Sequence, residues 1–190
     1  MSTETERARK LLMIKLVSHP NIIEHSLKVR RKALEIGRRL LKRGFKVDLE
    51  LLEIGSYLHD IGRSVTQDVR HGIESGKILR KLNFPERVIR MVERHVGAGI
   101  TAEEAGKLGL PNKNFVPETL EEKILSYADK FFESELVFGN ENGEETVERR
   151  EVEYDSIEPT LKKFRKMFGS KSPVVLRLEK LKDEMENYLN

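Results

Sequence analysis

The stretch YLHDIG, residues 57–62, places two adjacent ionisable side chains at the end of an apolar helical segment. Neighbouring side chains on a helix point about 100° apart, so His59 and Asp60 can reach one point only if the helix end is aimed at it. Gly62 can end the helix because glycine tolerates a left-handed backbone, and Ile61 can anchor the turn in the core. The stretch therefore predicts a helix end that presents two ligands to one place.

Four further ionisable residues lie on the apolar faces of separate predicted helices, and they are His25, His71, His95 and Asp129. A single inward histidine is usually a hydrogen-bonded core residue. A carboxylate such as that of Asp129, however, is costly to bury without a partner. Together with the doublet at 59–60, the economical account is a cation that neutralises two carboxylates and accepts several imidazoles. Such nitrogen and oxygen ligands suit Mn, Fe, Co, Ni or Zn better than Ca.

The rest of the chain predicts an all-α helical bundle, because apolar residues recur at intervals of three and four. Between residues 137 and 155 the letters NENGEE could form the turn of a short β-hairpin, but we expect an exposed loop there. The expected helices are 21–43, one capped by Asp48, about 69–82, one that starts at Pro85, 101–108, one capped by Thr119, and one that opens at Ser172 and Pro173.

Composition limits the kind of protein this can be. The chain has 190 residues, enough for a single domain. We expect an N-terminal helix in 1–19, a core in 20–135 that carries the six ionisable residues, and a helical extension in 136–190 packed on that core. The formal net charge of +3 is too small to argue for nucleic-acid binding. The lack of cysteine excludes disulfides and thiolate metal sites. No apolar run approaches the roughly 18 residues needed to span a membrane, so we expect a cytoplasmic protein.

The motif HDIG at 59–62, and the order in which the six ionisable residues occur, resemble the HD-domain superfamily over about 20–135. The flanking segments HGIESG, VIRMVERH and ILSYADK match as well. The resemblance implies a divalent metal held by His25, His59, Asp60 and Asp129. It also implies that His71 and His95 hold a second metal, or else bind phosphate or water. Many two-metal relatives have another histidine at the position of Val96, so the number of bound ions, one or two, stays open.

The implied activity is hydrolysis of a phosphate ester or anhydride, either a monoester or a diester, with a nucleotide as the expected substrate and a metal-activated water as nucleophile. Asp60 and Arg63 are the expected catalytic residues. Arg63 stands where related phosphodiesterases often carry Lys, and a cation there would contact a phosphoryl oxygen. Ser64, Arg70 and Lys130 are further candidates for substrate contacts, although a Lys beside a buried residue commonly extends toward solvent.

Other functions stay open from the sequence alone. A non-catalytic nucleotide-binding sensor predicts that a metal ligand is missing, and a di-iron oxidoreductase on the same fold needs a complete second metal site. The basic run at 160–172 could contact nucleic acid, but we expect an amphipathic helix with a solvated basic face. The apolar stripe of the last helix could pack on its own bundle or on a second copy in a homodimer.

Overall fold

Helices predominate in the structure, a computed structural model, and several begin at the residues that the sequence marks as caps. Asp48 accepts a hydrogen bond from the Leu51 amide, and Thr119 forms a capping box with Glu122. Pro173 lies in the first turn of the last helix. The predicted all-α fold class is therefore confirmed, with one small hairpin added.

The structure describes residues 2–141 and 144–190, with side chains described for all of these except 136–149. The elements in chain order are α1 (Thr3–Lys15), α2 (Pro20–Lys42), α3 (Leu49–Leu58), the 3-10 turn η1 (Ile61–Ser64), α4 (His71–Lys81), α5 (Glu86–Glu93), α6 (Ala102–Lys107), α7 (Leu120–Asp129), β1 (Phe132–Glu141), β2 (Glu144–Glu153), α8 (Glu158–Phe168) and α9 (Pro173–Leu189).

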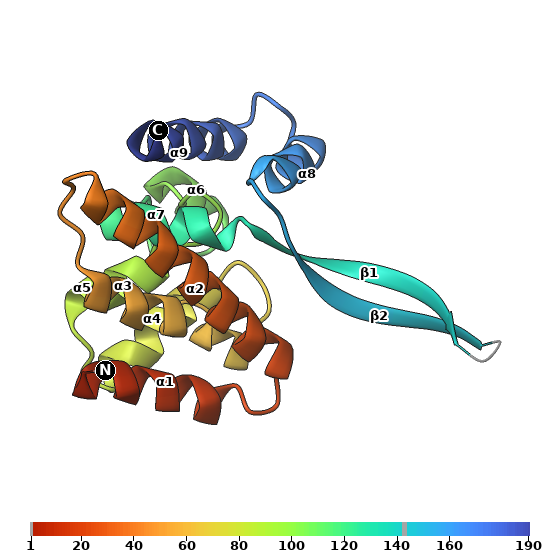
Figure 1. The fold of residues 1–190 in the computed structure, drawn as a ribbon, viewed down its shortest axis with the longest axis horizontal. Helices are drawn as coiled ribbons and strands as arrows, with labels where there is room; N and C mark the ends of the chain where they lie inside the picture. The colour runs from red at the N-terminus through yellow and green to blue at the C-terminus, as the bar shows by residue number, and fades with distance from the viewer. Residues whose placement is uncertain (1, 142–143) are drawn as a thin grey trace.

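The core lies between helices that are distant in the sequence. Helix α2 packs against α3 and α7, while α1 covers α3 from the other side (Figure 1). Helix α9 lies over α7, and its buried stripe closes the core through Val175, Leu178, Leu181 and Met185. The apolar stripe of the last helix therefore packs on its own body. The division of the chain into 1–19, 20–135 and 136–190 stays a prediction. Within the described ranges, no helix is long and apolar enough to cross a bilayer.

The expectation of an exposed loop at 137–155 was wrong, because strands β1 and β2 pair there as an antiparallel hairpin. Phe132 lies opposite Glu153, and the pairing continues to Glu141 opposite Glu144. Residues 142–143 of the expected turn lie outside the described residues. The hairpin projects from the helices (Figure 1). An isolated two-stranded hairpin is only marginally stable. Contacts with the helices at the base of this hairpin help to stabilise it, and the local sequence does not reveal them, which is why a loop was expected.

Candidate metal centre

The six ionisable side chains, four on or just after separate helices and two adjacent at the end of a fifth, meet at one place in the fold. Most stand at helix ends, where a side chain can point along the axis toward a common centre. His25 lies within α2, His59 is the C-cap of α3, Asp60 follows it, His71 begins α4, His95 follows α5, and Asp129 ends α7. Segments more than 100 residues apart therefore supply one site.

The first group of ligand atoms joins α2, α3 and α7. The Nε2 atom of His25 lies 3.3 Å from Nε2 of His59 and 3.0 Å from Oδ1 of Asp129. The Oδ2 atom of Asp60 is 3.9 Å from Nε2 of both histidines. Ligand atoms of His25, His59 and Asp60 lie close enough together to share one ion.

The second group uses the other oxygen of the same carboxylate. Oδ1 of Asp60 lies 3.1 Å from Nε2 of His71 and 3.4 Å from Nε2 of His95. The two Nε2 atoms are 3.1 Å apart. Asp60, His71 and His95 form a second set that could hold an ion. Asp60 is therefore shared between two adjacent groups, one oxygen toward each.

In three histidines, the hydrogen bond made by Nδ1, the ring nitrogen that points away from the centre, shows which nitrogen carries the lone pair. Nδ1 of His59, His71 and His95 lies 2.7–2.9 Å from the backbone carbonyl three residues earlier. A carbonyl can only accept, so Nδ1 carries the hydrogen in each ring. In the neutral imidazole Nε2 then presents a lone pair to the centre.

The donor set fits a divalent transition metal. Lone pairs of His71 and His95 face each other and the Asp60 carboxylate, and Oδ1 of Asp60 is buried without a hydrogen-bond partner among the described residues. Burial works to raise the pKa of Asp60, but neighbouring groups, first among them His59, outweigh it and hold that pKa well below its usual range. Burial lowers the pKa of the His59 imidazole to about 3. Carboxylate oxygens and imidazole nitrogens around one point are the ligands that Mn, Fe, Co, Ni and Zn accept.

The turn that carries the doublet is fixed by α4. The Ser75 hydroxyl accepts from the Gly62 amide at 2.8 Å and donates to the His59 carbonyl at 2.8 Å. A Cβ on Gly62 would lie 2.0 Å from the His71 carbonyl oxygen and 2.5 Å from the Ser75 nitrogen. The expectation that Gly62 adopts a left-handed conformation was wrong, because its backbone is in the 3-10 turn η1 and not at positive φ. Close approach of α4 is the physical reason for glycine here.

A cavity of about 490 Å³ opens on the first group of ligands. Its wall is made by α2, the turn after α3, the end of α7, the hairpin and α8. Side chains that bear on phosphate or base binding in this wall are Lys28, Arg63, Lys130, Arg150, Phe132 and Phe164. The cavity thus combines cations and aromatic rings with five carboxylates, those of Glu24, Asp60, Asp129, Glu133 and Glu151.

The candidate substrate-contact residues do not all reach this cavity. Arg63 donates from Nε to Oδ2 of Asp60 at 2.6 Å. Lys130 lies in the cavity wall, where it is buried and pairs with Asp129 and does not extend toward solvent. Among the candidate residues, Ser64 and Arg70 lie outside the cavity wall. The Ser64 hydroxyl donates to the Ile61 carbonyl, and Arg70 is exposed and pairs with Asp68.

One residue of the site was not expected from the sequence. Oε1 of Glu151, on strand β2, lies 2.5 Å from Nδ1 of His25. Burial works to lower the pKa of His25, but the hydrogen bonds that its ring donates to Asp129 and Glu151 outweigh burial and raise that pKa to about 10. The acid-rich pattern of 148–153 is common on exposed strands, so no signal in the sequence singles out Glu151.

The sequence is similar to one protein over nearly its whole length and to two enzymes over part of it. A family model described as HD domain matches residues 22–132. The chain is 41% identical over 184 residues to an uncharacterised protein of Methanocaldococcus jannaschii, covering 97% of this chain and 99% of that protein. It is 56% identical over 82 residues to the tRNA (cytidine(56)-2'-O)-methyltransferase of Picrophilus torridus, covering 43% of this chain and 24% of that enzyme. The enzyme of the same name from Thermoplasma volcanium is 40% identical over 121 residues, which is 64% of this chain and 34% of that enzyme.

Solved structures share the fold at low sequence identity. The phosphodiesterase PgpH HD domain of L. monocytogenes superposes with a TM-score of 0.52 at 15% identity, covering 95% of this chain and 97% of that one. The same domain in complex with cyclic-di-AMP gives a TM-score of 0.51 at 16% identity, covering 94% and 81%. At such identities the likeness bears on the fold.

Proposed function

Because the chain belongs to the HD domain family, we propose that it is a metal-dependent phosphohydrolase that acts on a phosphate ester or anhydride. The observation that carries the proposal is the position of Asp60, whose two oxygens each face a different pair of histidines beside a cavity with basic side chains. The family supports the fold and the use of a divalent metal. The site residues and the nucleotide substrate are our assignment.

The chain's own residues divide into two sets of ligands. His25, His59, Asp60 and Asp129 would hold one ion, and Asp60, His71 and His95 would hold a second. A divalent metal in such a site lowers the pKa of a water molecule and polarises a phosphoryl oxygen. The hydrogen bonds from Nδ1 to carbonyls keep three imidazoles in the tautomer that leaves Nε2 free.

Cations in the cavity wall would bind the phosphate and stabilise charge that develops on it. Arg63 lies in the cavity wall, where its Nε donates to Asp60 and its Nη1 donates to the Gln67 carbonyl at 3.3 Å. Lys28 and Lys130 flank the carboxylates from α2 and α7. Fixed donors aimed at a phosphoryl group act most strongly where water is excluded, so we assign Arg63 the leading role in transition-state stabilisation.

The size and the lining of the cavity support a nucleotide as the substrate. Small-molecule sites usually measure about 300–1,000 Å³, and this one measures about 490 Å³. Phe132 and Phe164 lie in its wall and could contact a base. The PgpH HD domain of L. monocytogenes forms a complex with cyclic-di-AMP, and we infer a nucleotide substrate here partly from that likeness.

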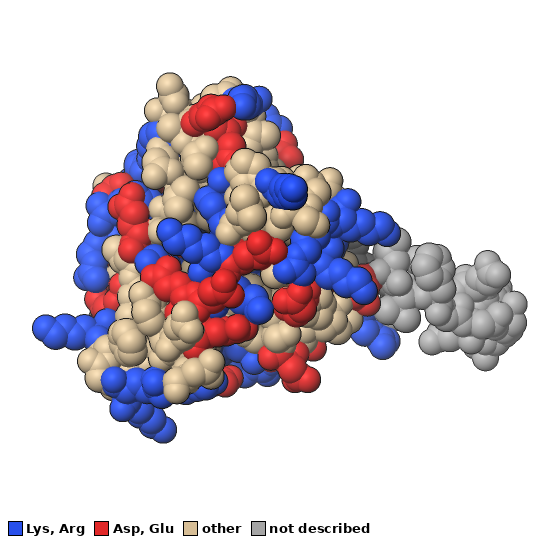
Figure 2. All heavy atoms as spheres, turned by 90° about the horizontal axis from the view of Figure 1, so that it is seen from above, with Lys and Arg blue, Asp and Glu red and all other residues tan. Residues whose placement is uncertain are grey.

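A phosphate carried by tRNA is a second candidate substrate. Regions similar to this chain occur within two tRNA methyltransferases, which suggests that the two activities serve one molecule. The surface gives this candidate less support. Figure 2 shows Lys and Arg interspersed with Asp and Glu over the face seen from above. In the basic run of α8, Lys163 pairs with Glu133 and Arg165 with Glu179.

The decisive experiment is a hydrolysis screen of the wild type and two variants, each loaded with Mn²⁺ or Co²⁺. The substrates are nucleoside monophosphates, cyclic nucleotides, dinucleoside polyphosphates, a generic phosphodiester and tRNA with a terminal phosphate. We expect Asp60→Asn to abolish turnover, and Asp183→Asn, an exposed carboxylate on α9, to leave it unchanged.

Three outcomes would contradict the proposal. Equal turnover in Asp60→Asn would exclude the metal mechanism. Tight nucleotide binding without turnover would favour a sensor. Oxygen-dependent turnover of iron-loaded protein would favour an oxidoreductase.

A further inference from the structure

His25 differs from the other three histidines in how its outer nitrogen is held. His59, His71 and His95 use carbonyls at helix ends or in a turn, where the backbone leaves acceptors available. His25 lies inside α2, where each carbonyl already accepts a bond from the amide four residues later. An acceptor for its Nδ1 must therefore come from another part of the chain.

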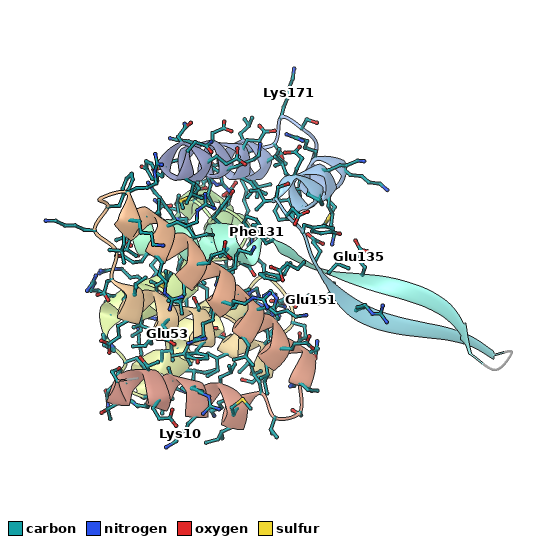
Figure 3. The ribbon with its side chains drawn as sticks, viewed as in Figure 1. Lys10, Glu53, Phe131, Glu135, Glu151 and Lys171 are labelled. Atoms are coloured by element: carbon teal, nitrogen blue, oxygen red, sulfur yellow. The ribbon has the colours of Figure 1, made fainter. Side chains whose placement is uncertain are left out.

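Strand β2 of the hairpin supplies that acceptor. Oε1 of Glu151 lies 2.5 Å from Nδ1 of His25, although 126 residues separate them in the chain. The two side chains are only 13% and 16% exposed, so water does not replace this contact freely. Figure 3 shows Glu151 at the base of the hairpin, where the strand passes α2. The carboxylate is thus part of the wall of the site.

Further contacts hold the strand in register with the helix. Nζ of Lys28 lies 3.2 Å from Oε2 of Glu151, and Nζ of Lys32 lies 3.3 Å from Oε1 of Glu153. Four residues of helix rise about 6 Å and two residues of strand about 6.6 Å. The two lysines of α2 therefore match the two glutamates of β2 in spacing. The matched spacing shows that β2 runs alongside α2 here, while the contact with His25 is made by Glu151 itself.

We propose that Glu151 is a positioning residue for the metal ligand His25, so that metal binding and docking of the hairpin stabilise one another. The inference rests on the ligand assignment made under the proposed function. A carboxylate that accepts the Nδ1 hydrogen holds the ring in orientation, leaves Nε2 free for the ion and makes it a better donor. By thermodynamic linkage, an ion that favours this arrangement also favours the docked hairpin.

Metal titration of three variants tests the inference without any turnover assay. Co²⁺ binding is followed by its visible absorption, which reports the ligand set. We expect Glu151→Ala to weaken binding at the first site 10–100-fold, the loss commonly seen when the hydrogen-bond partner of a metal-bound histidine is removed. Glu151→Gln keeps an oxygen that can accept from Nδ1 and should recover part of that loss. Glu153→Gln removes an equivalent contact between β2 and α2 and should bind Co²⁺ within twofold of wild type.

Hydrogen exchange of the β2 backbone amides gives a second readout. Co²⁺ should slow exchange in wild type and in Glu153→Gln, and should do so far less in Glu151→Ala. Equal Co²⁺ affinity in Glu151→Ala and Glu153→Gln would overturn the inference, as would a metal effect on exchange that survives in Glu151→Ala. Weakened binding in Glu151→Ala, in a protein that hydrolyses none of the substrates, would support the inference and overturn the proposed function alone.

Discussion

Replacement of Ser75 by Ala tests how the ligand doublet is held in place. The Ser75 hydroxyl is buried and bonds both the Gly62 amide and the His59 carbonyl, so it joins α4 to the turn that carries His59 and Asp60. Alanine would leave two buried backbone groups without this partner. Each such group costs about 1–3 kcal/mol. We therefore expect the variant to lose about 3 kcal/mol of unfolding free energy.

Thermal unfolding of the metal-free proteins measures this loss. For a domain of this size each kcal/mol lowers Tm by roughly 2–4 °C, so we expect a fall of roughly 6–12 °C. Ser26→Ala is the matched control, because Ser26 is also fully buried in a helix and its hydroxyl has no hydrogen-bond partner among the described residues. Both variants gain the same helix propensity from alanine, so the difference between them isolates the two hydrogen bonds.

The result that would refute this reasoning is a Tm of Ser75→Ala within about 2 °C of that of Ser26→Ala. The turn would then be held by other contacts, such as the burial of Ile61. A lower Tm together with weaker Co²⁺ binding would show that the same hydroxyl also maintains the ligand geometry.

Three further predictions concern the same site. Gly62→Ala should lower the free energy of unfolding by about 3 kcal/mol, because the new Cβ meets backbone atoms of α4 that cannot move aside. Gly106→Ala has open space around the new Cβ and should raise the free energy of unfolding by about 1 kcal/mol. Urea unfolding compares the two variants, and equal midpoints would contradict the prediction for Gly62. His71→Ala should reduce the bound Co²⁺ from two ions to one, as measured by elemental analysis after dialysis, and an unchanged ratio would remove His71 from the second ligand set. Since the pKa of His25 is raised to about 10 in the metal-free protein, it is protonated below that pH and an ion must displace this proton. Co²⁺ affinity should therefore weaken as pH falls from 9 to 6, and calorimetry in buffers of different ionisation heat should detect the released proton; a pH-independent affinity would contradict this.

The candidate ligands could be picked out from the sequence because they interrupt a regular pattern. His25 and Asp129 stand on apolar helical faces where a charged or polar residue needs a reason. Helix starts were also predictable, since Asp48 and Thr119 cap through contacts only three residues long. Such local regularities are visible in a single sequence, and they fix the fold class and the candidate ligands.

Contacts between distant segments were not predictable in the same way. Ser75 bonds a residue 13 positions earlier, and Glu151 bonds one 126 positions earlier. Neither interrupts a local pattern, because serine is common in helices and glutamate is common on exposed strands. The hairpin resembles a loop in the sequence for the same reason, since its stability comes in part from ion pairs with α2. The reason for Gly62 likewise lies in the close approach of α4.

The way the imidazoles are held determines which of them can be adjusted during evolution. His59, His71 and His95 are oriented by the main chain itself, and main-chain carbonyls are the same whatever side chains a relative carries. His25 alone among these four is oriented by a replaceable side chain, on a hairpin that projects from the helices. A relative could therefore exchange its hairpin and change the orientation of one candidate ligand, while the other three kept their geometry.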